Sequence, residues 1–359
     1  MRRKTFQFPA LVGLLAVAIV FAPCILRAQE KPLLIINDDC KTFAIGPGNQ
    51  IAYAVPKTKR IKKQTIERDE IWIADLDGKR RRIVDPDKFM PAPPPSTYIV
   101  NSLAWSPDGH KLAVSMTTME AASILEDQPA TGVKAIALLD DDGREIKVAG
   151  SKTRFIENAS NATWLADGET VAYLTPGSPY QISSVRPSDG KTKSLFEGHS
   201  FDVVVWDAKR NSAFVIGQNL SVRARGVLAQ LDLVHETVRE ITPVPLYQGQ
   251  LSLSPSGKKV AFFIDGDAIQ AVELANPAKV VKVRVGMGRF EWSRDEMHVL
   301  LKRGPDDASR ELVWVGLYDG SFAPALQGLE YHDFHVTPDG AYVAVTQPGS
   351  QIMKVFAAQ

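Results

Sequence analysis

One short unit recurs along this chain and constrains its fold more than any other feature: an apolar segment, a tight polar turn, then a second apolar segment. The clearest copy is Leu103–Val114, whose turn is the Ser-Pro-Asp-Gly of 106–109. Two more copies, Leu251–Phe262 and His335–Val345, keep nearly complete turns. Pro presets φ at the first corner, Asp or Ser accepts a hydrogen bond from the backbone ahead, and Gly adopts a positive φ. Alternating apolar residues on both sides predict two strands with one buried face.

Weaker copies fill the rest of the chain and bring the number of units to seven. They lie at 42–53, 162–173, 204–215 and 290–301. A second motif, a third strand that runs into an Asp-Gly turn, occurs at Glu70–Gly78 and again at Leu312–Gly320. All six Trp residues fall in these two motifs, and the Trp before the turn is expected to pack between neighbouring sheets. Spacings near the ~40–45 residues of a four-stranded blade predict an all-β, seven-bladed β-propeller of four-stranded antiparallel blades.

The units assign everything after residue 28 to a single propeller domain, 29–359. The expected blades cover approximately 40–89, 98–154, 156–200, 201–245, 247–287, 288–329 and 330–359. The last unit is too short for a fourth strand, whereas the segment 33–37 is apolar enough to supply one. Because an unjoined ring would leave two sheet faces exposed, we expect this N-terminal segment to close the last blade as its outer strand.

The first 28 residues have the pattern of an export signal. Arg2, Arg3 and Lys4 precede an apolar run, Phe8–Leu26, and a cut after Ala28 would place a small residue at the cleavage point. The alternative is an uncleaved anchor, because the run is near the length that crosses a bilayer. We expect a periplasmic or secreted protein with no later membrane span. Removal of these residues leaves a formal charge of −3, which gives no electrostatic reason to expect a nucleic-acid partner.

The repeat also resembles a known family. The Ser-Pro-Asp-Gly turn with Leu112-Ala113-Val114 after it, together with the motif at 71–78, looks like the WD40-like (PD40) repeat of TolB-type propellers. The resemblance covers nearly all of the chain after residue 28 as a pattern. It implies a periplasmic or secreted propeller that presents surfaces to partners. The chain departs from that family in showing no preceding α/β domain and seven units where the family has six, so the partners of TolB are not carried over.

Motifs that carry chemistry are weak in this sequence. The string nearest to a serine-hydrolase elbow, Gly198–Asp202, lacks the final Gly, so we assign no catalytic residue. Three contiguous Asp residues at 140–142 resemble the start of a calcium loop, but contiguous acids before a Gly predict a hairpin turn. The sequence predicts no metal site and no cofactor.

The weak candidates for ligand binding are His332, Asp333 and His335. In a strand the two imidazoles point to opposite faces, so they converge only if the strand starts after Asp333. The simpler interpretation is a group of rim residues on an inner strand. The alternative is a metal or ligand contact in the channel.

Two polar insertions, Lys57–Glu70 and Met116–Gly132, lie between the second and third strands of adjacent units. We expect both on the same face, with the basic run Lys57–Lys63 as a solvated loop and a short helix at Met119–Asp127. These features favour a non-catalytic binding scaffold of the cell envelope, whose partner is a protein or an envelope polymer. The alternatives are a propeller enzyme, polysaccharide lyase-like or glycan-processing, with a channel metal, and a membrane-tethered structural propeller.

Overall fold

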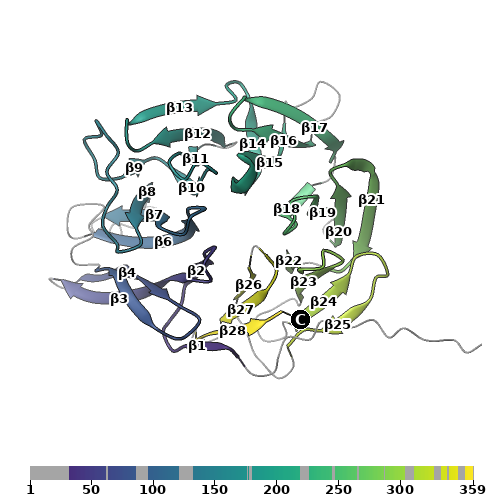
Figure 1. Cartoon of the computed structure of the whole chain (residues 1–359), viewed down its shortest axis with the longest axis horizontal. Coiled ribbons are helices and arrows are strands. Elements are labelled where there is room, and N and C mark those ends of the chain that lie inside the picture. The colour runs from purple at the N-terminus through teal and green to yellow at the C-terminus, as the bar shows by residue number, and fades with distance from the viewer. Residues whose placement is uncertain are drawn as a thin grey trace, which may run out of the picture.

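Small antiparallel sheets follow one another around a central axis and form a ring in the computed structural model of this chain (Figure 1). The structure describes residues 32–61, 64–85, 96–120, 132–175, 177, 180–218, 226–244, 247–264, 267–286, 288–303, 311–326, 333–337, 339–346 and 352–358. Across these ranges the only helix is one 3-10 turn, Ala208–Arg210. The predicted all-β class is therefore confirmed.

Five of the sheets are separate blades of four strands. Three of them are β10 to β13 (Ser160–Trp164, Val171–Thr175, Gln181–Arg186, Lys191–Leu195), β14 to β17 (Ser200–Asp207, Ser212–Gln218, Val227–Asp232, Thr237–Pro243) and β18 to β21 (Tyr247–Leu253, Lys259–Ile264, Ala268–Glu273, Asn276–Arg284). The other two are β22 to β25 (Gly288–Trp292, His298–Arg303, Glu311–Gly316, Phe322–Pro324) and β26 to β28 (Asp333–Val336, Tyr342–Thr346, Met353–Ala357) with β1 (Leu34–Ile36).

The strands β2 to β9 form one eight-stranded sheet. They are β2 (Thr42–Ile45), β3 (Ile51–Ile61), β4 (Gln64–Ala74), β5 (Arg80–Val84), β6 (Ser96–Trp105), β7 (Lys111–Glu120), β8 (Val133–Asp140) and β9 (Ile156–Glu157). The prediction of seven four-stranded blades is therefore wrong, because only five are found. The cause is strand length: β4 has 11 residues and β6 has 10, and the extended part of β4 reaches β6, where Arg68 pairs in parallel with Tyr98.

The same strand extension changes the expected insertions. The residues Lys57–Ile61 belong to β3 and pair with β4 as far as Ile61 opposite Gln64, so the solvated loop predicted there is wrong. The side chain of Ile66 is buried, which anchors the hairpin to the protein. The helix predicted to start at Met119 is also wrong at its start, because β7 continues to Glu120; residues 121–131 lie outside the described residues.

The last blade is completed by the N-terminal strand, as predicted. The strand β1 pairs antiparallel with β28, with Leu34 opposite Val355 and Ile36 opposite Met353. The side chains of Leu34 and Ile36 enter a core that also contains residues of β2, β3 and β4. This strand therefore joins the last blade to the eight-stranded sheet, and the ring is closed.

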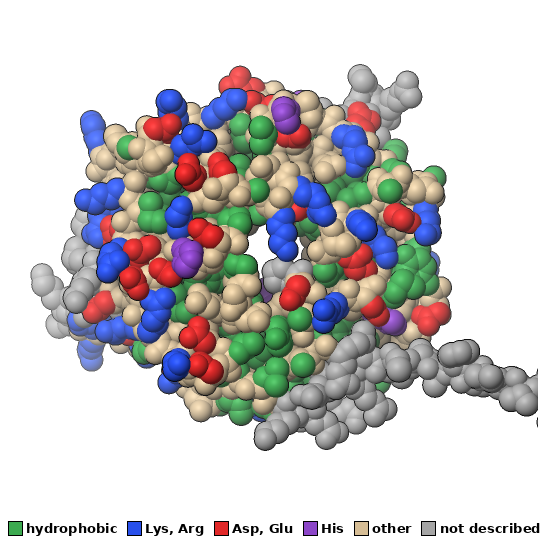
Figure 2. All heavy atoms as spheres, viewed as in Figure 1, with side chains coloured by type: hydrophobic (Ala, Val, Ile, Leu, Met, Phe, Trp, Pro, Cys, Tyr) green, Lys and Arg blue, Asp and Glu red, His purple; other side chains and the backbone are tan. Residues whose placement is uncertain are grey.

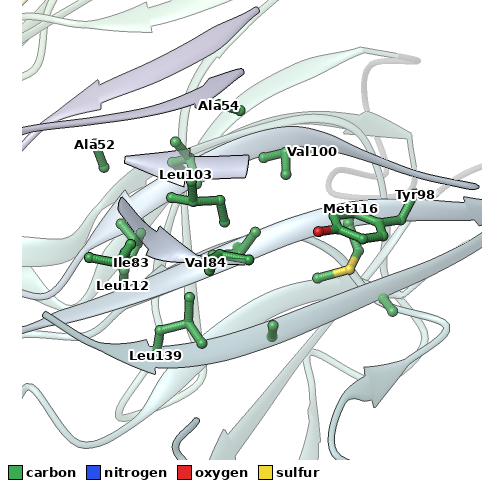
Figure 3. Packing of buried hydrophobic residues seen from close by; sticks show 14 of the residues in the cluster. Ala52, Ala54, Ile83, Val84, Tyr98, Val100, Leu103, Leu112, Met116 and Leu139 are labelled. Carbon is green, nitrogen blue, oxygen red and sulfur yellow. The ribbon is translucent and has the colours of Figure 1, made fainter. Parts of the chain in front are cut away.

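Apolar side chains of neighbouring units fill the space between them. Figure 3 shows one such core, in which Leu103 and Leu112 lie near Ile83 and Val84. The Trp residues before the turns pack in these cores as predicted. Three of them also donate the indole N–H to an inner-strand carbonyl of the preceding unit: Trp105 to Ala44 (3.2 Å), Trp206 to Asn161 (3.0 Å) and Trp292 to Ser252 (3.2 Å).

A candidate binding pocket at one mouth of the channel

The first strand of each unit lies nearest the central axis (Figure 1). Residues of four such strands line a pocket. Its volume is about 510 Å³. The lining residues come from the start of β2 and the residue before it, from β6, and from the starts of β22 and β26: Lys41–Phe43, Ile99–Leu103, Arg289, Asp333 and His335. Because β2, β22 and β26 begin here, the pocket lies at the channel mouth from which the connections between second and third strands also emerge.

A cluster of charged side chains from β22 and β26 forms one side of the pocket. The guanidinium of Arg289 donates to Asp333 Oδ1 (2.5 Å) and to Glu291 Oε1 (2.7 Å). The Arg289 Nη2 atom, which donates to Glu291, also lies 2.9 Å from His335 Nδ1 and 3.1 Å from His335 Nε2. The imidazole Nδ1 is also 2.9 Å from Glu291 Oε1. The four groups therefore form one polar cluster across the boundary between two blades, in which the ion pairs are charge-assisted.

Two aromatic rings hold this cluster in place. The guanidinium carbon of Arg289 lies 5.4 Å from the centroid of the Phe334 ring, a cation–π arrangement. The ring of Phe43, from β2, meets the imidazole of His335 edge to face, with centroids 4.6 Å apart. The Glu291 carboxylate also accepts a hydrogen bond from the Val336 backbone N–H. Packing and hydrogen bonds thus fix the orientation of each polar side chain before a ligand arrives.

Two of the three residues that the sequence suggests for ligand binding lie together in the pocket. Asp333 and His335 lie two residues apart on β26 and both line the pocket, whereas His332 lies outside the described residues. Sequence reasoning missed Arg289 and Glu291, which sit between Gly288 and Trp292. These two residues could have been predicted because they alternate on a short strand that was expected to be innermost, where charged side chains are unusual. No group of three His, Cys, Asp or Glu side chains in the described ranges is placed to hold a metal ion.

The long β3–β4 hairpin lies next to β2 and β6, whose residues line the pocket, and is tied to the lining residues at two points. Lys41, at the edge of the pocket, forms an ion pair with Glu67 Oε1 (2.7 Å). The Val100 backbone N–H donates to Asp69 Oδ2 (2.6 Å), and the Tyr98 hydroxyl donates to the Asp69 carbonyl (2.8 Å). Burial raises the pKa of Asp69 to about 6, against the opposing effect of the Val100 hydrogen bond. The extended hairpin is therefore held rigidly beside the pocket.

Neutral polar groups remain available inside the pocket. A register shift between Val100 and Ser102 leaves Asn101 unpaired in the β6–β7 ladder, and such bulges re-aim side chains. The Asn101 amide nitrogen donates to Thr117 Oγ1 (2.7 Å), which leaves its oxygen open. Within the described residues the hydroxyls of Thr42 and Ser102 have no hydrogen-bond partner. The pocket therefore offers uncommitted neutral groups beside charges that are already paired.

The other sequence motifs have structural roles. Ser200 begins β14 and is followed by strand as far as Asp207, so the Gly198–Asp202 string is not a strand-to-helix elbow. The Asp triplet forms the predicted hairpin turn: β8 ends at Asp140, whose carboxylate accepts from the Arg144 N–H (2.7 Å), and Gly143 has φ +81°. Neither motif contributes to the pocket.

Comparisons with known proteins establish the fold. No protein-family model and no curated protein matches the sequence. The chain is similar to one in the crystal structure of the mitotic checkpoint complex (TM-score 0.60, 13% identity, 100% of this chain and 99% of that one). It is also similar to the β-propeller domain of Cps50 (Swd1) from Myceliophteria thermophila (TM-score 0.59, 13% identity, 93% and 100%). TolB from Acinetobacter baumannii matches less well (TM-score 0.41, 12% identity, 74% and 80%).

These likenesses identify the chain as a β-propeller repeat protein. They do not establish the narrower TolB-type family that the repeat motif resembles. Within the described ranges, no helix has the length and apolar character needed to cross a membrane.

Proposed function

We propose that this protein is an exported, non-catalytic scaffold that binds a partner protein at the channel mouth where the inner strands begin. One observation carries the proposal: the pocket and the extended β3–β4 hairpin lie together, joined through Lys41–Glu67 and Val100–Asp69. A concave pocket beside a rigid hairpin gives a partner a large contact area. Because the hairpin is already ordered, binding loses little conformational entropy of this protein. The β-propeller fold suits a protein-binding scaffold.

The polar groups of the pocket support a binding role. The side chains of Arg289, Glu291, Asp333 and His335 are held by contacts with one another, so they present fixed polar groups to a ligand. The open hydroxyls and the Asn101 oxygen can bond to the amide groups of a polypeptide loop. An envelope polymer is the other occupant, and the experiment below separates the two.

The test is a capture experiment with the intact chain and an envelope extract. Ser102→Trp fills the pocket without breaking a described hydrogen bond, and Ser194→Trp, on the exposed face of β13, is the matched control. We expect the first variant to lose a protein that the wild type and the control retain. Equal recovery by all three would refute the assigned site, and loss of a protease-resistant polymer alone would replace the protein partner with a polymer.

The exported location rests on the basic residues at 2–4 and the apolar run 8–26. N-terminal sequencing of the protein recovered from its native compartment tests it. A mature terminus at Gln29 supports cleavage and export, whereas an intact Met1 on membrane-bound protein supports an anchor instead.

A further inference from the structure

The turns between first and second strands follow a rule on the opposite face of the ring. In four of them the third turn residue is Asp, and its Oδ1 accepts a backbone N–H two residues further on: Asp108 from His110 (3.0 Å), Asp167 from Glu169 (2.9 Å), Asp295 from Met297 (2.8 Å) and Asp339 from Ala341 (2.9 Å). Partial burial raises the pKa of these carboxyls, but the hydrogen bonds outweigh it, so each pKa lies below its usual range. Each of these carboxyls is therefore ionised at neutral pH, and two of them also face a basic side chain: Asp167 faces Arg186, and Asp295 faces His298.

Three of the seven turns lack this Asp. The turn between β2 and β3 has Gly48 in its place. The other two turns are neighbours and have Lys209, between β14 and β15, and Ser256, between β18 and β19. The first turn adopts a 3-10 conformation that ends at Asn211 with φ +49°. In the second, Ser256 Oγ accepts the Lys258 N–H at 3.3 Å, a longer bond than any of the four Asp bonds. Departures from a local sequence preference are expected at functional sites. The absence of Asp from these two turns therefore points to a functional role.

The consequence is a basic sector made of Lys209, Arg210, Lys258 and Lys259. Lys209 and Lys258 are exposed and have no ion-pair partner among the described residues. Two carboxylates contact these turns: Asp207 is bound to Arg210 Nη1 (2.7 Å), and Glu296 Oε1 accepts the Ser256 backbone N–H (2.5 Å). Four basic residues against two carboxylates leave the sector positive. Figure 2 shows Lys and Arg side chains beside the central opening, on the side where β15 and β18 lie in Figure 1.

The two turns are fixed relative to each other. Arg210 Nη2 donates to the Ser256 carbonyl (2.5 Å), and Arg210 lies so close to Gly257 that a Cβ there would be 1.8 Å from its Nη1. On the other side, Lys259 Nζ donates to the Glu296 carbonyl (2.9 Å). The ring therefore sets the distance between the two turns, and with it the spacing of the basic residues that they carry.

We propose that this basic sector is a second docking site, which takes an acidic, extended segment of a partner protein. Charge complementarity favours an anionic occupant. The four Asp turns on the same face argue against a flat anionic membrane, because a membrane covering the mouth would meet them as well. A narrow segment can lie across two turns and avoid the others. The site is independent of the pocket on the opposite face.

The test uses the full chain and a labelled peptide of alternating Glu and Ser, with binding followed by fluorescence anisotropy. Lys209→Glu with Lys258→Glu is expected to weaken binding by roughly tenfold or more, with the loss shrinking at high salt. Lys147→Glu with Lys152→Glu makes the same charge change at exposed residues elsewhere and should bind like the wild type. Equal affinity of all three proteins would overturn the proposal, as would tighter binding to phosphatidylglycerol vesicles than to the peptide.

A second variant separates binding from folding. Ser256→Asp restores the residue that four sister turns use, so we expect the thermal midpoint to hold or rise while affinity for the acidic peptide falls. Unchanged affinity in this variant would show that the missing carboxylates have nothing to do with anion binding.

Discussion

Neighbouring units in this ring are joined in two different ways. Between β18 and β22 the contact is made by side chains: the Gln250 amide bonds both the N–H (3.0 Å) and the C=O (2.6 Å) of Phe290, and Trp292 bonds the Ser252 carbonyl. Between β4 and β6 the main chains themselves pair, at Arg68 and Tyr98, and the Asp69 carboxylate is buried between them.

Both junctions solve the same problem. The inner edge of each sheet presents backbone groups that would otherwise be buried without partners. An uncharged amide or indole can hydrogen-bond these backbone groups at every pH. A buried carboxylate can also bond them, but its effect on the free energy of unfolding depends on whether it is ionised. The merged sheet therefore contains a junction whose stability depends on pH, and its strands β2 and β6 also line the pocket.

The largest effect is expected from the ring closure, a third junction that uses main-chain pairing with no buried charge. Deletion of residues 31–38 removes β1 and uncovers the core that Leu34 and Ile36 help to fill. Loss of these two side chains alone costs about 3–6 kcal/mol, and the whole ring should unfold at a lower temperature. Ile35→Ser, at an exposed position of the same strand, is the control. An unchanged thermal midpoint after the deletion would contradict closure by β1.

Next in size is the loss of an indole from a side-chain junction. Trp292 is almost fully buried between the blades β18–β21 and β22–β25, so Trp292→Ala should cost about 3–5 kcal/mol of unfolding free energy. Trp292→Phe keeps most of the packing but loses the bond to Ser252 and should cost less. Urea unfolding of both variants measures the difference. Equal losses would mean that the hydrogen bond, and not the packing, dominates this junction.

The two kinds of junction also differ in how far the sequence reveals them. The turn at 106–109 and the Trp before it are local signals, and both lie where the repeat predicts them. The closing strand was predictable because the apolar segment 33–37 could supply the fourth strand that the last unit lacked. These predictions succeed because turn chemistry and alternation act over a few residues.

The merged sheet and the pocket depend on contacts that no local pattern encodes. Arg68 meets Tyr98 only because β4 continues past the usual end of a blade strand, and a polar, basic segment such as 57–63 gives no sign of doing so. Arg289 joins Asp333 and His335 from strands far apart in sequence. The sequence could therefore suggest the pocket residues Asp333 and His335 on β26, but not their partner Arg289.

The third prediction uses the pH dependence of the merged junction. The pKa of Asp69, about 6 in the folded protein, exceeds the ordinary value of 3.8, so its contribution to stability is full below about pH 4 and is lost as the pH rises through 6. In Asp69→Asn this loss is absent, and the variant should gain up to about 3 kcal/mol relative to the wild type between pH 4 and pH 7.5. Any steric or hydrogen-bonding cost of the amide is the same at both pH values.

Urea unfolding at the two pH values measures this effect. Asp77→Asn is the control, because hydrogen bonds from Lys79 lower the pKa of that exposed turn carboxyl and the sign of its pH dependence is reversed. A stability difference between wild type and Asp69→Asn that does not change with pH would show that the merged junction carries no titratable cost.

The smallest effect is expected at the uncharged junction. Gln250→Ala removes the partner of both backbone groups of Phe290. Each of the two part-buried hydrogen bonds contributes about 0.5–1.5 kcal/mol, so the expected loss totals about 1–3 kcal/mol. Because an amide does not titrate, this loss should be the same at pH 4 and pH 7.5, unlike that of Asp69→Asn. Gln181→Ala truncates an exposed amide on β12 that makes no side-chain hydrogen bond to a described residue and should leave stability unchanged. A loss in Gln250→Ala that grew with pH would erase the distinction between the two junctions.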